Sequence, residues 1–251
     1  MIPLSVIIIT KNEEHNISDC LHSVRWAKDI VIVDAESKDA TVEKAKQYTH
    51  KIFIKPWLGF AEAKTFAVQH TECDWVLWLD ADERVTEELA QEIQQLLQEK
   101  IISYNSYFVA RRAYFLGRWI KHSGWYPGRV VRLFHKNYAA FNSAAVHEGL
   151  EIKGESGILR NDLLHFTDPN LHHYFEKFNR YTTLASQELF SQKRKFRLVD
   201  LLLRPSWLFC KMYIIKLGFL DGIQGFILAI ISSVYVFTKY AKLWEQWKNK
   251  N

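Results

Sequence analysis

The sequence predicts an α/β fold, in which a sheet is covered by helices on both faces and a helical C-terminal region follows. Over the first hundred residues, short runs rich in Val and Ile alternate with helical patterns, which is typical of a parallel sheet. Three of these runs adjoin polar, acid-rich segments. After residue 204 the sequence becomes strongly apolar and basic, which predicts a separate helical region. A chain of 251 residues can hold one large domain, or a domain with an appendage.

The first part of the chain contains four expected strands, LSVIIIT (4–10), DIVIVDA (29–35), KIFIK (51–55) and WVLWLD (75–80). Helical patterns follow them at 16–27, 41–49, 60–71 and 86–100. Asn16, with Asp19 three residues later, and Thr41 are the expected N-caps of the first two helices. Ligands of such sheets bind beyond the carboxyl ends of the strands, so the polar segments 11–14, 34–39 and 80–83 should converge on one crevice.

The middle of the chain has a different pattern. Residues 106–117 and 129–136 are expected strands, with loops at 118–128 and 137–147, and residues 168–192 form an expected helix.

The C-terminal region combines apolar and basic sequence. Residues 222–238 contain no charged side chain. Residues 191–251 carry eleven Lys and Arg against three Asp and Glu, a net charge of +8, and the whole chain is +5, so the remainder is −3. One interpretation is a buried helical hairpin. The interpretation we favour is a segment at about 206–240 that associates with a membrane surface rather than crossing it.

Composition excludes several classes of protein. With 48 % apolar and 24 % charged residues, the chain is not a disordered protein. Three scattered cysteines without a Cys-x-x-Cys argue against a disulfide framework or a zinc knuckle and fit a reducing compartment. The first apolar run is too short for a signal peptide, so we expect a cytoplasmic protein. Basic residues accompany apolar segments instead of forming a solvated stripe, which argues against a nucleic-acid partner.

The fourth expected strand ends in Asp80-Ala81-Asp82-Glu83, where three carboxylates repel one another. Two carboxylates at this spacing can hold Mg²⁺ or Mn²⁺, which keep open positions for phosphate oxygens. Such an ion would cancel the repulsion and neutralise a diphosphate leaving group. The plainer interpretation is an ordinary acidic turn.

Four segments, taken in order, resemble the family 2 glycosyltransferases of the nucleotide-sugar (GT-A) fold: SVIIITKNEE, VDAESKDAT, GFAEAKTFAV and WVLWLDADERV. Three later segments, GWYPGRVVRLF, AAVHEGL and GFLDGIQGF, are similar to a narrower group, the bacterial lipopolysaccharide inner-core β-1,4-glucosyltransferases. The resemblance implies a Rossmann-like mixed sheet in a catalytic domain at 1–165, with a nucleotide-sugar half at 1–104 and an acceptor half at 105–165. The remainder, 166–251, would be the helical, membrane-associating region.

The resemblance also implies roles for individual residues. The donor nucleotide would be surrounded by Thr10, Asn12, Glu13, Asp34, Lys64 and Asp80. Within this set Asp34 would contact the uridine, Asp80 would face the ribose or the metal shell, and Asp82 would be the direct metal ligand. The sequence departs from the family pattern at Ala35-Glu36, which leaves the role of Asp39 open, and at Thr65, where Asn is frequent. Plainer roles are a turn cap for Asp34, a solvated helix position for Lys64 and a helix-dipole contact for Glu13.

Inversion at the anomeric carbon needs a base on the face opposite the leaving diphosphate. Glu148, in Val-His-Glu-Gly, is the expected general base, and a structural His–Glu pair is the alternative. His147 or His165 would be a third metal ligand, unless each is satisfied structurally. Arg129 and Arg132 would hold phosphate, or else be plain surface charge.

The expected function is therefore metal-dependent, inverting transfer of a sugar, glucose from UDP-glucose, to a heptose of the lipopolysaccharide inner core. The acceptor is lipid-anchored, so the enzyme would meet the cytoplasmic face of the inner membrane. Three alternatives stay open: transfer to polyprenyl phosphate, a phosphohydrolase with Asp80 as nucleophile, and an inactive membrane scaffold. The phosphohydrolase is disfavoured because such enzymes usually carry the motif on their first strand. Processive synthesis is disfavoured because the sequence has no Gln-x-x-Arg-Trp.

Overall fold

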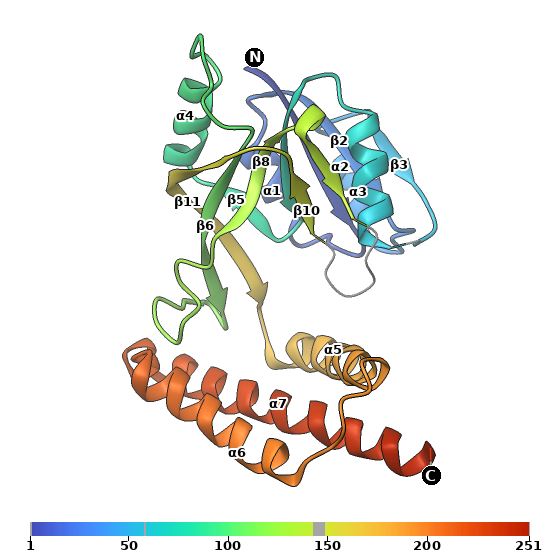
Figure 1. The fold of residues 1–251 in the computed structure, drawn as a ribbon. Coiled ribbons are helices and arrows are strands. Elements are labelled where there is room, and N and C mark those ends of the chain that lie inside the picture. The colour runs from blue at the N-terminus through green and yellow to red at the C-terminus, as the bar shows by residue number, and fades with distance from the viewer. Residues whose placement is uncertain (1, 58, 143–148, 251) are drawn as a thin grey trace. The chain divides into compact units, whose positions relative to one another are not determined.

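The computed structural model describes residues 2–57, 59–142 and 149–250 (Figure 1). The chain divides into two compact units. The first comprises Met1–Arg111 and Arg129–His165, and the second comprises Arg112–Gly128 and Phe166–Asn251. The loop expected at 118–128, together with residues 112–117 before it, therefore groups with the C-terminal helices.

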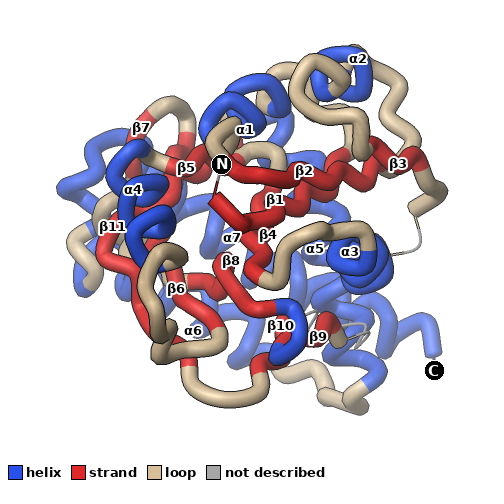
Figure 2. Tube along the Cα trace, turned by 90° about the horizontal axis from the view of Figure 1, so that it is seen from above, coloured by secondary structure: helices blue, strands red, loops and turns tan. Residues whose placement is uncertain are grey.

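The described residues form a nine-stranded mixed sheet in the order β3-β2-β1-β4-β8-β6-β11-β5, with β7 paired to β6. Its parallel strands are β1 (Ile2–Thr10), β2 (Ala27–Asp34), β3 (Ile52–Ile54) and β4 (Trp75–Asp80). The other strands of this sheet are β5 (Glu83–Val85), β6 (Ser106–Phe115), β7 (Arg118–Trp119), β8 (Val130–His135) and β11 (Ser156–Asp168). A separate pair consists of β9 (Ala139–Phe141) and β10 (Leu150–Ile152). The predicted mixed α/β sheet is confirmed, and Figure 2 shows its strands with helices around them.

Both faces of the parallel strands are buried because alternate side chains of a strand point to opposite faces. Leu4, Val6 and Ile8 of β1 are fully buried in one core, to which α1 (Ile17–Ser23), α2 (Thr41–Ala45) and α4 (Glu87–Leu96) contribute. Ile7 and Ile9 lie in a second core with α3 (Phe60–Gln69). Each buried aliphatic side chain stabilises the fold by roughly 1.5–3 kcal/mol, so these strands form the rigid base of the site.

Of the two predicted N-caps, Asn16 is confirmed in position and Thr41 is wrong. Asn16 is the N-cap residue of α1, although its side chain makes no capping hydrogen bond. Its side chain instead bonds Glu13, at 2.8 Å, and Arg84, at 3.0 Å. Thr41 is the first residue of α2 and follows the N-cap residue Ala40. Local propensity predicted caps at these helix starts. The Asn16 and Thr41 side chains make polar contacts with other residues instead, so neither side chain caps its helix.

The second unit is mainly helical, with α5 (Leu171–Ser191), α6 (Leu198–Phe209) and α7 (Gly222–Lys250). A π-helical turn, Cys210–Ile215, and a 3₁₀ turn, Gly218–Asp221, connect α6 to α7. Within the described part of the chain, one helical stretch, Gly218–Lys250, has the length and apolar composition needed to cross a membrane. Many helices that never cross a membrane meet the same criterion, so composition alone does not decide the role of α7.

Candidate active site

The carboxyl ends of three parallel strands meet at one edge of the sheet. Thr10 pairs in register with Asp34, and Ile9 pairs with Asp80. Hydrogen bonds tie the loops beyond these ends, because the Asn12 amide donates to Ser37 Oγ at 2.8 Å. The predicted convergence of the polar segments is confirmed.

Asp39, whose role the sequence left open, organises this edge of the sheet. Its carboxylate accepts hydrogen bonds from the Glu14 amide, at 3.1 Å, and from the Thr41 hydroxyl, at 2.5 Å. These bonds join the loop after β1 to the start of α2. Burial would raise the pKa of Asp39, but hydrogen bonds from Thr41 and Glu14 lower it. Asp39 is therefore an ionised structural carboxylate.

Arg132 supplies the positive charge at the acidic turn after β4. Its Nη2 lies 2.5 Å from Asp80 Oδ2 and 2.7 Å from Glu83 Oε1. The Arg132 and Glu83 side chains are almost completely buried, so both charges are paired inside the protein. From the sequence we expected a metal ion alone to offset the repulsion between the acids. In the structure, the Arg132 guanidinium on β8 offsets much of that repulsion.

The pKa values of Asp80 and Glu83 are shifted in opposite directions. Burial would raise the pKa of Asp80, but Arg132 and Lys64 hold it below its usual range. Burial raises the pKa of Glu83 despite the attraction of Arg132. The Asp80 carboxylate is thus an ionised group with a fixed position, which is the condition for orienting a polar ligand.

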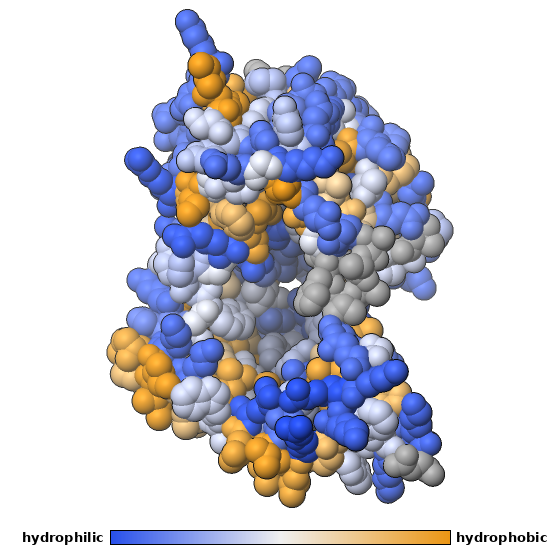
Figure 3. All heavy atoms as spheres, in the orientation of Figure 1, coloured by the Kyte–Doolittle hydropathy of each residue, from blue (hydrophilic) through white to orange (hydrophobic). Residues whose placement is uncertain are grey.

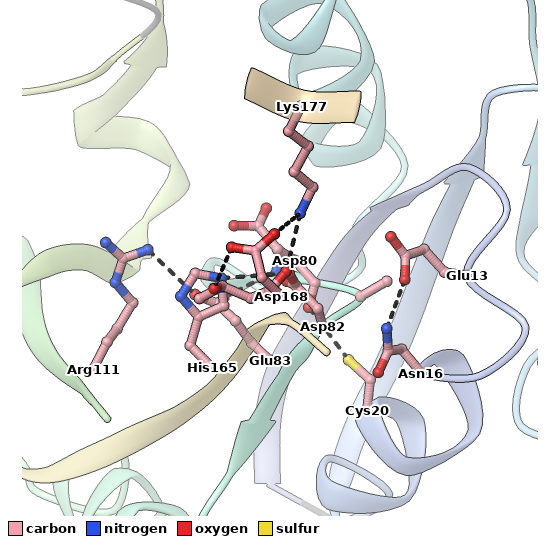
Figure 4. Close-up of polar contacts among 12 residues, drawn as sticks. Glu13, Asn16, Cys20, Asp80, Asp82, Glu83, Arg111, His165, Asp168 and Lys177 are labelled. Carbon is pink, nitrogen blue, oxygen red and sulfur yellow. Dashed lines mark hydrogen bonds and ion pairs between the residues drawn. The ribbon is translucent and has the colours of Figure 1, made fainter. Parts of the chain in front are cut away.

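Asp82 lies beside His165 and outside the Arg132 pair. His165 Nε2 is 3.4 Å from Asp82 Oδ2, and each side chain is 17 % exposed (Figure 4). The antiparallel pairing of β11 with β5 places His165 opposite Glu83, next to the acidic turn. A carboxylate and an imidazole that face one another are therefore presented together at the sheet edge.

The residues present fit a divalent cation with two protein ligands. Carboxylate oxygen and imidazole nitrogen are both donors that Mn²⁺ accepts, and Mg²⁺ or Mn²⁺ normally keeps further positions for phosphate and water. In the described ranges, no group of three or more His, Cys, Asp or Glu side chains could hold a metal ion. Asp82 and His165 would be two protein ligands of such an ion.

Lys64 and Trp78 line the same region. Lys64 Nζ lies 3.8 Å from the centroid of the Trp78 ring, and the Arg132 guanidinium lies 4.1 Å from that centroid. Lys64 is buried, so the solvated helix position considered from the sequence is excluded. Both cations contact the Trp78 indole and bring positive charge to the edge where the acids lie.

Three of the buried polar atoms that lack a partner lie at this edge of the sheet. Thr10 Oγ1, Trp78 Nε1 and Arg132 Nε are buried and have no hydrogen-bond partner among the described residues. Such atoms are rare in folded proteins, and a bound polar ligand is one way to satisfy them.

A cavity of about 440 Å³ opens along the same strand ends. It is lined by Ile9, Val33 and Ala35 of the sheet edge, by Lys55 and Trp57 after β3, and by residues of α3. The acidic turn does not line this cavity, although Ile9 pairs in register with Asp80. The cavity is mainly apolar, which suits a planar base, and Val33 and Ala35 line it whereas Asp34 between them does not.

The remaining residues predicted for the site lie in different surroundings. Asp34 is fully buried, and its two oxygens accept hydrogen bonds from the Ser37 amide and hydroxyl, so it does cap the turn that follows β2. Glu13 bonds Asn16, and Arg129 is exposed just before β8. Glu148 and His147 lie outside the described residues.

Sequence reasoning placed Glu83 in the crevice without a role of its own and missed Arg111. Arg111 Nη1 on β6 lies 3.8 Å from Glu83 Oε1, and burial lowers the pKa of Arg111 (Figure 4). The signal that was available is the charge of RVVRLFHK and FVARRAYF, because a charged side chain inside an apolar strand needs a buried partner.

A family model described as glycosyl transferase family 2 matches residues 5–163. The chain belongs to glycosyl transferase family 2. The match begins in β1 and ends in β11, so it contains the acidic turn and the cavity. This glycosyltransferase is 30 % identical over 254 residues to the lipopolysaccharide core biosynthesis glycosyltransferase LpsC of Rhizobium meliloti strain 1021, covering 98 % of this chain and 93 % of LpsC. It is also 30 % identical over 258 residues to an uncharacterised glycosyltransferase of Rickettsia typhi, covering 96 % and 87 % of the two chains.

Solved structures place this glycosyltransferase in the GT-A fold. The mannosyltransferase PcManGT of Pyrobaculum calidifontis, solved with GDP-Man and Mn²⁺, superposes with a TM-score of 0.55 at 13 % identity, covering 96 % of this chain and 87 % of that one. Residues 1–349 of TarS of S. aureus, solved with UDP, give a TM-score of 0.50 at 15 % identity, covering 99 % and 92 %. At these identities the likeness establishes the fold alone.

Proposed function

We propose that this family 2 glycosyltransferase transfers glucose from UDP-glucose to a heptose of the lipopolysaccharide inner core, with inversion and with a bound Mg²⁺ or Mn²⁺. The observation that carries the proposal is the pairing of Asp82 with His165 at the sheet edge, beside the Arg132-bound Asp80. The lipopolysaccharide acceptor is supported by the full-length similarity to LpsC. We place the chain on the cytoplasmic face of the inner membrane, with a catalytic domain at 1–165 and a helical region at 166–251.

The donor would bind along the strand ends. We assign the base to the cavity lined by Val33 and Ala35 and the ribose to the surroundings of Asp80, with Thr10, Asn12 and Glu13 at the same strand ends. Lys64 would attract the diphosphate, since its ammonium group lies over Trp78 at the same edge. Arg132 holds Asp80 in place, which is the role we prefer to phosphate binding because its Nη2 already contacts two carboxylates. Arg129, exposed before β8, stays a phosphate-binding proposal.

The bound cation would supply charge neutralisation of the departing diphosphate. Asp82 and His165 would hold it, and the buried Arg132–Glu83–Asp80 cluster would keep the turn that bears Asp82 rigid. A general base must take the proton of the acceptor hydroxyl on the opposite face of the sugar, and Glu148 is our choice.

A donor screen tests the proposal. Purified protein is given UDP-glucose, UDP-galactose, UDP-N-acetylglucosamine or GDP-mannose with a heptose-containing core acceptor, and release of nucleoside diphosphate is measured with and without chelator. UDP-glucose should give the highest turnover, and chelator should remove it. Equal turnover in chelator by the Asp82→Asn variant would reject the metal role, and label appearing on polyprenyl phosphate instead of core saccharide would favour the alternative acceptor.

A further inference from the structure

The second unit exposes an apolar surface along its helical hairpin. On α7 the exposed apolar side chains recur at helical spacing, and they are Ile223, Phe226, Ile230, Val234, Phe237 and Trp244. On α6 they are Leu198, Val199, Leu202, Leu203 and Trp207. The turns between the helices add Ile214, Ile215, Leu217, Phe219 and Leu220. We call these residues the hairpin surface. Figure 3 shows hydrophobic residues gathered along α6 and where α6 leads into α7.

Only one side of α7 is exposed in this way. Its opposite sides pack on α6 and α5, burying Leu228, Ala229 and Leu243. The exposed row runs from residue 223 to residue 244, which corresponds to about 32 Å at 1.5 Å per residue. A helix with an apolar row on one side matches an interface, whereas a helix that crosses a bilayer alone is apolar all round.

The contact of α7 with α5 argues further against crossing. Lys242 Nζ donates to Asn179 O at 3.0 Å and to Thr183 Oγ1 at 2.7 Å, and Tyr235 Oη donates to Tyr181 O at 3.2 Å. α5 also carries Glu176, Lys177, Arg180 and Glu188. Inserting α7 across the hydrocarbon core would either pull these charges into lipid or break the polar contact between the helices.

Basic residues border the hairpin surface. The exposed ones include Lys193, Lys195 and Arg197 before α6, Lys211 and Lys216 in the turns, and Lys248 and Lys250 at the end of α7. Of the three acids at 191–251, Glu245 is exposed, and Asp200 accepts from Arg204 at 2.6 Å and from Arg194 at 3.2 Å. Buried Asp221 accepts from the backbone amides of Lys121 and His122. Long Lys stems can follow an apolar surface while their ammonium groups reach phosphate headgroups.

We propose that α6, the turns after it and α7 lie flat in one leaflet of an anionic phospholipid bilayer, with the hairpin surface at the acyl boundary and the basic residues among the headgroups. Exposed apolar area and exposed positive charge in the same helical segments match this lipid chemistry, and each Lys or Arg near an anionic surface adds about 1 kcal/mol. The inference rests on the proposed function in that a lipid-anchored acceptor requires a membrane, but its test needs no sugar transfer.

Vesicle co-sedimentation of the full chain tests the surface. Vesicles of phosphatidylethanolamine with phosphatidylglycerol should bind the wild-type chain, and vesicles of phosphatidylcholine alone should bind it at least about tenfold more weakly. The double variant Leu203→Glu with Ile223→Glu changes two side chains that are each 63 % exposed, and it should lose binding at least about tenfold. The matched control is Ile158→Glu, at 59 % exposed on β11 in the first unit, which should bind as the wild type does. Equal binding by all three proteins, or equal binding to both kinds of vesicle, would overturn the inference.

A labelling experiment distinguishes lying flat from crossing. Cys20 and Cys73 are buried, so Cys210→Ser removes the exposed thiol and Asn249→Cys adds one at the end of α7. When the protein is added outside sealed vesicles, a membrane-impermeant maleimide should label residue 249. Protection of that thiol would mean that α7 crosses, which contradicts the proposal.

Two further readouts separate the remaining outcomes. If the wild type ignores vesicles and the Glu variants turn a dimer into a monomer, the surface binds a second copy and the lipid proposal fails. UDP titration of the same proteins reports on the proposed function separately, because vesicle binding without nucleotide binding would reject that function and keep this inference.

Discussion

The Arg132 guanidinium on β8 lies 2.5 Å from the Asp80 carboxylate at the end of β4. The two residues are 52 positions apart, and the same guanidinium bonds Glu83. This contact makes a turn of three acids compatible with a buried strand end, and it leaves Asp82 available for another partner.

Arg132→Ala should therefore destabilise the protein by about 3–5 kcal/mol, because it leaves the buried Glu83 carboxylate without its main partner. Urea unfolding of the full chain measures the loss. Adding Glu83→Gln to the variant should restore part of the stability, since the uncompensated charge is then absent. The control is Arg129→Ala, an exposed arginine three residues earlier, which should leave the unfolding midpoint unchanged. Equal unfolding midpoints of Arg132→Ala and Arg129→Ala would contradict the proposed role of Arg132 in pairing the buried carboxylates.

His165→Ala should weaken Mn²⁺ binding at least about tenfold in the presence of UDP, because it removes one of the two protein ligands we assign. Electron paramagnetic resonance of free Mn²⁺ measures the affinity without any turnover. His50→Ala, an exposed histidine before β3, is the control and should not alter the affinity. Unchanged Mn²⁺ affinity in His165→Ala would remove this residue from the site.

The parts of this site that sequence predicted and the parts that it missed differ in physical origin. The four parallel strands follow from local apolar runs, and the polar segments at their ends follow from sheet geometry. The strands β5 and β11 were missed because Glu-Arg-Val after an acidic turn and the polar run from Ser156 carry little local strand signal. His165 reaches Asp82, and Arg132 reaches Asp80, only through antiparallel register between distant segments. No local pattern determines that register, so His165 could be a candidate from sequence but Arg132 could not be recognised as the partner of Asp80.

Asp29 should make stability depend on pH in the acid range. Burial would raise the pKa of Asp29, but hydrogen bonds from Lys51, the Glu72 amide and Ser5 together lower it. A carboxyl whose folded-state pKa is lowered stabilises the protein above its unfolded pKa of about 3.9, and that stabilisation is lost as pH falls through the folded-state pKa. Asp29→Asn should thus cost about 1–3 kcal/mol at neutral pH and progressively less below about pH 4.

Urea midpoints of the wild type and of Asp29→Asn, measured at several pH values, test this dependence. Asp74→Asn removes a carboxylate that is 64 % exposed and lies 3.6 Å from Lys136, so it serves as a surface control with little effect. A stability difference for Asp29→Asn that stays constant from neutral to acid pH would show that its ionisation is not linked to folding.

Gly225→Ala should destabilise the second unit although alanine favours helices. A Cβ at this position would lie 2.1 Å from the Gly218 carbonyl oxygen and 2.9 Å from Asp221 Cβ. The first of these is backbone, so the 3₁₀ turn would have to move away from α7, and overpacking of this kind typically costs about 1–3 kcal/mol. That cost exceeds the gain of about 1 kcal/mol that alanine brings to a helix interior. Ile223→Ala, two residues earlier and exposed, is the matched control, because it should leave thermal unfolding unchanged while reducing vesicle binding. If Gly225→Ala instead raised the unfolding temperature, the close packing of the turn against α7 would be wrong.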